Sequence, residues 1–204
     1  MKNIIKNALI LTAITLVSGV LLGFVYEITK GPIALSKEKA KQEAYQKVLS
    51  EADTFKTYEE WDQKNMSDML KKANLEGCSI DEVVLATKGD TVVGYVITAT
   101  SSEGYGGDIQ VSVGILDEGT VNGVAILSIS ETVGLGMRAA EPEFYTQFNG
   151  KRVKMFVLTK NGAKAENEID AISGATITST AVTNAINAGV LCHSSMSIGG
   201  SVNE

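Results

Sequence analysis

The chain has 204 residues, of which 44% are hydrophobic and 21% charged, and its formal net charge is −6. Most of the negative charge lies in residues 31–204, where 15 Lys and Arg stand against 23 Asp and Glu, a net charge of −8. Such a surface repels phosphate backbones and anionic lipid head groups, so we exclude nucleic acid as a partner.

The first 30 residues read as a membrane anchor. After Lys2 and Lys6, the nineteen residues 8–26 carry no charge. As a helix rising about 1.5 Å per residue, they nearly span the roughly 30 Å hydrocarbon core of a bilayer. A cleaved signal peptide is the alternative, but its apolar core is usually about 7 to 15 residues and ends at small residues. Leu22, Phe24 and Val25 occupy that place here.

The charges around the anchor predict its orientation. Lys2 and Lys6 precede the apolar run, whereas Glu27 and Lys30 nearly cancel after it. Positive residues stay on the cytoplasmic side, so we expect a single-pass protein of the cell membrane, in contact with lipid, with a cytoplasmic N-terminus and an extracytoplasmic main domain.

One face of the anchor consists of small residues. Their spacing of three and four places them on one side of a helix, and Gly19 and Gly23 form the close-packing motif of membrane helices. The face predicts a neighbouring membrane helix, but glycine and threonine are also common in membrane helices generally, and both interpretations stay open. The residues of this small-residue face are Ala8, Thr12, Thr15, Gly19 and Gly23.

Residues 31–76 are predicted to form a helical connecting segment packed loosely on the main domain. Gly31-Pro32 should break the anchor helix. A thin apolar stripe follows at Ala44, Val48 and Leu49, then a turn over residues 57–61 and a short helix over residues 67–73.

Residues 77–204 predict an α+β domain with a twisted, largely antiparallel sheet and flanking helices. Residues 83–86 and 91–98 read as a hairpin around Lys88-Gly89-Asp90. Further strands are expected over residues 109–116, 121–127 and 152–158. Residues 180–190 have the apolar spacing of an amphipathic helix that closes the domain.

Cysteine and histidine are too few for metal chemistry. Cys78 and Cys192 form no CxxC pair, so an iron–sulfur cluster held by four thiolates is excluded, and any redox chemistry needs an organic cofactor. The two cysteines either form a disulfide or remain separate buried thiols. His193 is the single histidine and reads as structural or incidental. We therefore expect neither a metal site nor a catalytic residue.

Three glycine-containing loops lie where strands or helices should end: residues 104–107, 131–136 and 170–179. Such loops are where binding residues concentrate. The third loop suits a phosphate, because small residues allow close backbone approach and the following helix would present free amides. The alternative is that Ser179 or Thr180 simply caps that helix and the glycine makes a turn.

The third loop also carries a family resemblance. Ser173-Gly174-Ala175-Thr176, with Asp170 three residues before the serine, resembles the flavinylation motif of the RnfG/NqrC-type FMN-binding domain, which is found in the Rnf complex and in the sodium-pumping NADH:quinone reductase. The spacing and length resemble the Rnf form more closely. The resemblance implies that FMN is joined covalently to Thr176 by a phosphoester bond, and that a dedicated flavin transferase attaches it.

The second loop extends the resemblance. Residues 131–136 are similar to the family's Glu-Thr-Pro-Gly-Leu-Gly loop beside the flavin ring. Val133 replaces the usual proline, and Ile129 stands where a histidine often precedes the glutamate. The resemblance implies two groups of cofactor-binding residues besides Thr176: Glu131, Thr132, Leu135 and Gly136 at the ring, and Ser173, Gly174, Ala175, Ile177 and Thr178 at the phosphate.

The resemblance implies an electron-carrier subunit of a membrane-bound, ion-translocating ferredoxin:NAD oxidoreductase, with no substrate turnover of its own. Its partners would be the other membrane subunits of an Rnf-type complex, which carry flavins and iron–sulfur clusters. Two alternatives stay open: a freestanding membrane-anchored flavoprotein reductase, and a non-redox extracytoplasmic scaffolding protein.

Overall fold

A computed structural model describes residues 1–199 and the side chains of residues 1–196. The chain separates into two compact units, Met1–Gln42 and Glu43–Glu204. The division into an anchor of residues 1–30, a connecting segment of residues 31–76 and an FMN-binding domain of residues 77–204 stays a prediction.

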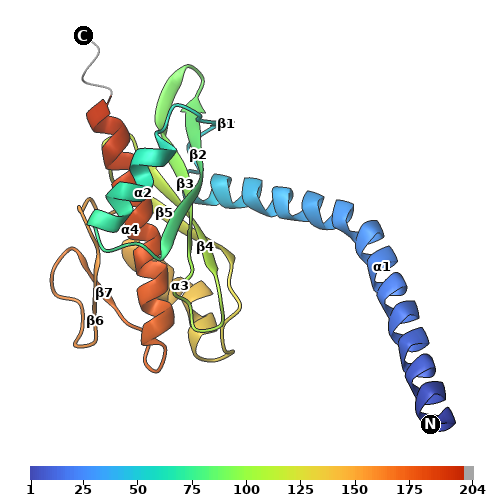
Figure 1. Cartoon of the computed structure of the whole chain (residues 1–204). Coiled ribbons are helices and arrows are strands. Elements are labelled where there is room, and N and C mark those ends of the chain that lie inside the picture. The colour runs from blue at the N-terminus through green and yellow to red at the C-terminus, as the bar shows by residue number, and fades with distance from the viewer. Residues whose placement is uncertain (200–204) are drawn as a thin grey trace. The chain divides into compact units, whose positions relative to one another are not determined.

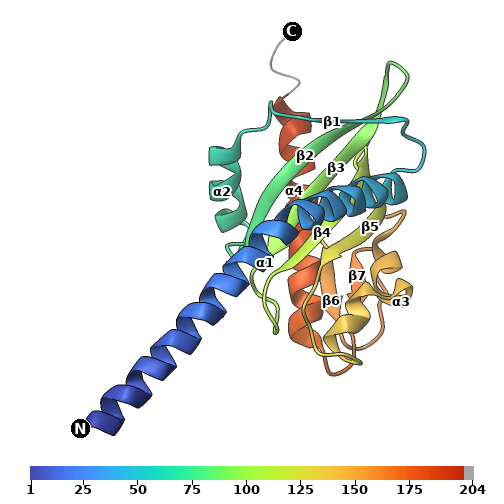
Figure 2. The ribbon, with the colours of Figure 1, turned by 90° about the vertical axis from the view of Figure 1, so that its right-hand side faces the viewer.

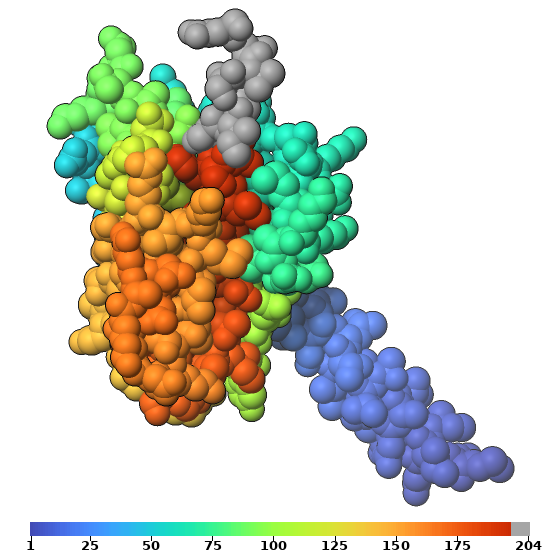
Figure 3. All heavy atoms as spheres, turned by 90° about the vertical axis from the view of Figure 1, so that its left-hand side faces the viewer, coloured from blue at the N-terminus to red at the C-terminus, as the bar shows by residue number. Residues whose placement is uncertain are grey.

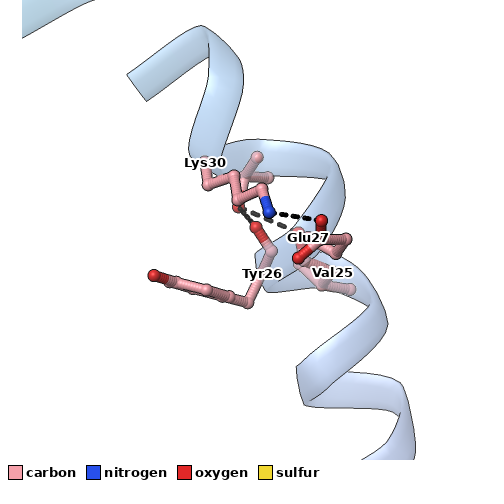
Figure 4. Close-up of polar contacts among 5 residues, drawn as sticks. Val25, Tyr26, Glu27 and Lys30 are labelled. Atoms are coloured by element: carbon pink, nitrogen blue, oxygen red, sulfur yellow. Dashed lines mark hydrogen bonds and ion pairs between the residues drawn. The ribbon is translucent and has the colours of Figure 1, made fainter. Parts of the chain in front are cut away.

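Helix α1 runs from Lys2 to Val48 without interruption, and Figure 1 shows it as one continuous helix. The predicted break at Pro32 is therefore wrong. Proline removes one backbone hydrogen bond and its ring crowds the carbonyl four residues earlier, at a cost of about 3 kcal/mol, which α1 tolerates. The turn before Pro32 carries an ion pair between Lys30 and Glu27 (Figure 4). The Thr29 hydroxyl there donates to the Val25 carbonyl.

The N-terminal part of α1 is long and apolar enough to cross a membrane. Its large side chains, including Leu9, Leu16 and Leu22, are exposed and are not buried against the rest of the chain. An all-round apolar helix of this length is typical of a membrane span.

The main body is built on a five-stranded antiparallel sheet in the order β1-β2-β3-β4-β5. The predicted hairpin is confirmed, with a two-residue turn in which Gly89 has a φ of +58°. The predicted strand over residues 109–116 is also confirmed. The strands are β1 (Thr54–Thr57), β2 (Cys78–Lys88), β3 (Thr91–Ser101), β4 (Ile109–Leu116) and β5 (Val121–Ser128).

Each face of the sheet is covered by a helix (Figure 2). Helix α4 (Thr176–Gly199) packs on one face and buries a continuous apolar core with β2, β3 and β4. The last turn of α1 packs on the other face, where Tyr45, Val48 and Leu49 are at most 1% exposed. The expected loose packing of this segment is wrong, since the apolar stripe is fully buried.

A pair of glycines lets α1 approach the sheet closely. Gly114 on β4 faces Gly123 on β5 across the strand pair. A Cβ atom on Gly114 would lie 2.6 Å from the Val48 carbonyl oxygen, and one on Gly123 would lie 3.0 Å from the Val48 Cα. The Asn122 side-chain amide donates a hydrogen bond of 2.7 Å to that carbonyl oxygen, which satisfies the end of the helix.

The segment between α1 and the hairpin holds one strand that the sequence did not predict. The short edge strand β1 replaces the expected helical character at residues 54–57. Helix α2 (Gln63–Lys72) begins four residues before the predicted helix, because the Asp62 side chain caps it by accepting from the amides of Lys64 and Asn65.

The segment between β5 and α4 is mostly irregular. It contains η1 (Gly136–Ala140), α3 (Pro142–Tyr145), η2 (Thr146–Phe148) and two short parallel strands, β6 (Val157–Thr159) and β7 (Glu168–Asp170). The expected strand over residues 152–158 is therefore wrong for all but its last two residues. Only these two belong to a strand, β6, which pairs with β7. Figure 3 shows this segment on one side of α4 and α2 on the other.

Helix α4 begins at Thr176 and not near residue 180 as predicted. Ser179 and Thr180 therefore lie inside the helix, and the interpretation of either as its cap is wrong. Their hydroxyls donate back to the carbonyls of Ala175 and Thr176, four residues earlier.

Candidate functional site

The three glycine-containing loops meet around one cavity of about 650 Å³. Each loop contributes to the wall, although 23 or more residues of chain separate one loop from the next. The volume falls within the range of about 300–1,000 Å³ that is typical of cofactor sites. The lining residues are Tyr105, Glu131, Thr132, Leu135, Gly136, Gly174, Ala175, Thr176, Ile177 and Thr178.

The third loop turns into α4 through a glycine that needs its backbone freedom. Gly174 has a φ of +78°, a conformation that strains residues with a Cβ atom, and an added Cβ would also press on the Leu135 side chain at 3.2 Å. Ala175 follows, with its amide donating to the Ile172 carbonyl. The turn places Thr176 at the first position of α4, partly exposed and in the cavity wall.

The start of α4 suits an anionic group. The amides of Thr176, Ile177 and Thr178 donate to no described residue. Free amides and the positive end of the helix dipole attract phosphate at such a position. Among the described residues that line the cavity, none is Lys or Arg, so these amides and the threonine hydroxyls are what the wall offers a phosphate.

Glu131 is a buried carboxylate in the wall, only 9% exposed. Its Oε1 atom accepts a hydrogen bond of 3.2 Å from the Gly106 amide, which ties the first loop to the second. Gly136 leaves room for it, because a Cβ there would lie 2.7 Å from Glu131 Oε2 and 2.6 Å from the Thr178 hydroxyl oxygen. Glycine at position 136 is therefore required by two polar side chains that converge on one wall.

Apolar side chains surround the mouth of the cavity. Tyr105, Leu135 and Ile177 each come from a different loop and are 73%, 45% and 55% exposed. A polar start of a helix next to exposed apolar side chains fits a ligand with an anionic tail and a flat apolar ring. FMN has this chemistry, and the residues present fit it.

The structure brings together nine of the ten residues that the sequence singled out. Ser173 differs, because it is exposed and lies outside the residues that line the cavity. Tyr105 lines the cavity but was not among the predicted site residues. The signal that could have found it is its place between the glycines of the first loop, where binding residues concentrate.

Both cysteines are buried free thiols, so the disulfide alternative finds no support in the described structure. Burial raises the pKa of the Cys78 thiol to about 11 and that of Cys192 to about 12. Thiolates are the reactive form, so both side chains are inert core residues near neutral pH.

The fold and the cavity define a class of protein: an α+β ligand-binding domain attached to one long apolar helix. Comparison with known families agrees. Residues 104–190 match the FMN-binding domain family, and residues 1–48 match the RnfG N-terminal region. The chain belongs to the RnfG family, whose members are the G subunits of ion-translocating oxidoreductase complexes.

Relatives in this family cover almost the whole chain. The one from the Na⁺-translocating ferredoxin:NAD⁺ oxidoreductase complex of Acetobacterium woodii is 32% identical over 198 residues, covering 96% of this chain and 94% of that protein. The one from the proton-translocating ferredoxin:NAD⁺ oxidoreductase complex of Clostridium ljungdahlii is 33% identical, with 88% and 86% covered. A third, from an ion-translocating oxidoreductase complex of Methanosarcina acetivorans, is 33% identical, with 93% and 94% covered.

Among solved structures, Shewanella oneidensis NqrC aligns with 57% of this chain and 61% of its own, at 21% identity and a TM-score of 0.48. Family membership and the apolar helix together make the chain a single-pass, membrane-anchored subunit of an oxidoreductase.

Proposed function

We propose that this chain is an electron-carrier subunit of an Rnf-type ferredoxin:NAD oxidoreductase and holds FMN covalently on Thr176. In this role the chain turns over no substrate of its own. It binds a flavin and presents it to neighbouring redox subunits, and the complex as a whole couples ferredoxin oxidation and NAD reduction to ion transport. The flavin supplies the redox chemistry when bound.

The convergence of three loops around Thr176 is the observation that carries this proposal. The cavity wall combines the free amides at the start of α4 with apolar side chains at the mouth. In the proposed complex, the amides of Thr176, Ile177 and Thr178 hold the phosphate, and Leu135, Gly136, Thr132 and Glu131 lie at the ring. Ser173 is exposed within the third loop and remains a proposed phosphate contact.

Covalent attachment is a phosphoryl transfer to the Thr176 hydroxyl. A bond forms between Thr176 Oγ1 and phosphorus of a flavin-carrying donor, the bond from phosphorus to the donor's leaving group breaks, and the hydroxyl proton is released. No electrons are exchanged. Thr176 is partly exposed at the cavity wall, so its hydroxyl is open to a flavin transferase. The helix start then stabilises the charge of the product.

The proposed surroundings follow from the anchor and the family. The partners are the flavin- and iron–sulfur-carrying membrane subunits, the flavin transferase during maturation, and membrane lipid. Lys2 and Lys6 favour a cytoplasmic N-terminus and an extracytoplasmic domain. A reporter fused after Glu204 should therefore be active outside the cytoplasm in intact cells, whereas cytoplasmic activity would reverse this orientation.

The electron-carrier role is tested in the complex. Thr176→Ala should leave the complex assembled, because the fold stays intact. It should reduce ferredoxin-dependent NAD reduction to background, because the flavin is missing. Thr180→Ala removes an exposed hydroxyl one helical turn away and should keep activity. Full activity of the Thr176→Ala complex would disprove the carrier role. A chain that carries flavin but copurifies with no membrane subunit would instead favour a freestanding reductase, and one that never carries flavin a scaffolding protein.

A further inference from the structure

Tyr105 has a large aromatic side chain that is exposed to solvent at the mouth of the cavity. It is 73% exposed and lines the same cavity as Thr176. It makes no hydrogen bond or ring contact with any described residue. By contrast, Tyr58 and Tyr95 on the main body pack edge to face against each other, with ring centroids 5.7 Å apart.

The loop that carries Tyr105 is fixed by its glycines. A Cβ on Gly104 would lie 3.0 Å from Glu131 Oε1, and one on Gly106 would lie 1.9 Å from the carbonyl oxygen of Ser130, the residue just before the second loop. The Gly106 amide also donates to Glu131. Residues on both sides of Tyr105 therefore lie against the second loop, so the backbone holds the tyrosine beside the cavity and does not let it swing away as a free loop tip would.

The neighbouring side chains complete an apolar surface around the mouth. Leu135 and Ile177 are exposed aliphatic residues from the other two loops. Aromatic rings pack favourably on other flat rings in offset or edge-on arrangements, worth about 0.5–1.5 kcal/mol beyond the area they bury. An exposed tyrosine on a fixed loop at this position is arranged to receive such a ring.

We propose that Tyr105 contacts the cofactor: its ring packs against the flavin ring and shields it from solvent. The proposal rests on the proposed function, because it needs flavin in the cavity. It adds a residue to the site and assigns it a task distinct from attachment, which belongs to Thr176. The phenol also quenches flavin emission on contact, because tyrosine is readily oxidised by an excited flavin whereas phenylalanine is not.

The test uses the full-length chain, produced together with a flavin transferase, in detergent. Wild type is compared with Tyr105→Phe and Tyr105→Leu, and flavin load is fixed by intact mass and by absorbance after denaturation. We expect equal loads. Emission per folded flavin should rise several-fold in both variants, whereas quenching by iodide should increase only in Tyr105→Leu, which lacks the shielding ring.

Val133→Ala is the matched control, because Val133 is 87% exposed in the second loop but does not line the cavity. It should leave emission and iodide quenching as in wild type. Equal emission and equal iodide quenching in wild type and Tyr105→Leu would overturn the proposal, and so would loss of flavin from folded Tyr105→Leu, which would assign Tyr105 to attachment. Absence of flavin from wild type would instead count against the function on which the proposal rests.

Discussion

The Ser179 hydroxyl accepts a hydrogen bond of 3.0 Å from the Ile172 amide and so joins α4 to the start of the loop that holds Thr176. The same hydroxyl donates to the Ala175 carbonyl at 2.8 Å. Ser179 is completely buried. One side chain inside the helix therefore fixes both ends of the turn Ser173-Gly174.

Ser179→Ala should destabilise the protein and loosen this turn. The change leaves the buried Ile172 amide without a partner, which costs about 1–3 kcal/mol. Thr180→Ala is the control, because its exposed hydroxyl bonds only to the Thr176 carbonyl, and surface changes usually stay within about 0.5 kcal/mol. Thermal unfolding of the full chain in detergent, followed by circular dichroism, measures both. Equal midpoints for the two variants would show that the Ser179 bond does not hold the turn.

The sequence predicted the strands and loops whose signals are local. Strand β4 has the predicted bounds because Ile109, Val111, Val113 and Ile115 alternate along it and all face the core. Strands β1 and β7 were missed because each has only three or four residues and shows a strand pattern only once its partner is known. Their positions depend on tertiary contacts that no local pattern contains.

The start of α4 was missed for a different reason. Serine and threonine favour helix caps, so the hydroxyl-rich stretch predicted a start near residue 180. In the structure, Gly174 makes the turn, and the hydroxyls of Ser179, Thr180 and Thr183 bond to carbonyls within the helix. The family motif pointed to residues that line one cavity, but it could not reveal that Tyr105 lines the same cavity.

Gly114→Ala should destabilise the main body by roughly 1–3 kcal/mol, as overpacked cores do. The added methyl group would lie 2.6 Å from the Val48 carbonyl oxygen and force the end of α1 from the sheet. Gly189→Ala is the matched control in α4, where a new Cβ would meet Val113 at 3.5 Å, an ordinary contact. It should be stabilising by up to about 1 kcal/mol, because alanine favours helix. If both variants unfold at the wild-type midpoint, α1 does not depend on the glycine pair.

His193 should make stability depend on pH. Burial lowers the pKa of His193 below 6.5, and Arg152 adds to this, whereas Asp117 and Glu118 oppose it. The folded state therefore binds a proton less readily than the unfolded chain, so stability is full above about pH 6.5 and falls as the pH drops toward the folded pKa. His193→Gln should flatten this part of the profile of unfolding midpoint against pH. An unchanged slope in that window would rule out His193 as its source.

The small-residue face of the anchor predicts contact with another membrane helix. Within this chain, the Cβ positions of Gly19 and Gly23 have nothing within 4 Å. Changing both to leucine should keep the helix in the membrane, since hydrophobicity rises, and hold a neighbouring helix away. Membrane content should be normal, and recovery of the complex on a tagged partner subunit should fall. Val20→Leu with Leu21→Ile is a control off this face. Normal recovery of the glycine variant would mean that other surfaces make the contact.

The most direct test of covalent FMN on Thr176 is to locate the modified atom by mass. Cleavage after Lys164 gives a C-terminal peptide that contains Thr176 and the competing hydroxyls of Ser173, Thr178 and Ser179. The chain is made together with a flavin transferase, and the peptide is fragmented. We predict an FMN-sized increment that maps to Thr176 and disappears entirely in Thr176→Ala. An increment on another hydroxyl, one that persists in Thr176→Ala, or none in the wild-type peptide would contradict the assignment.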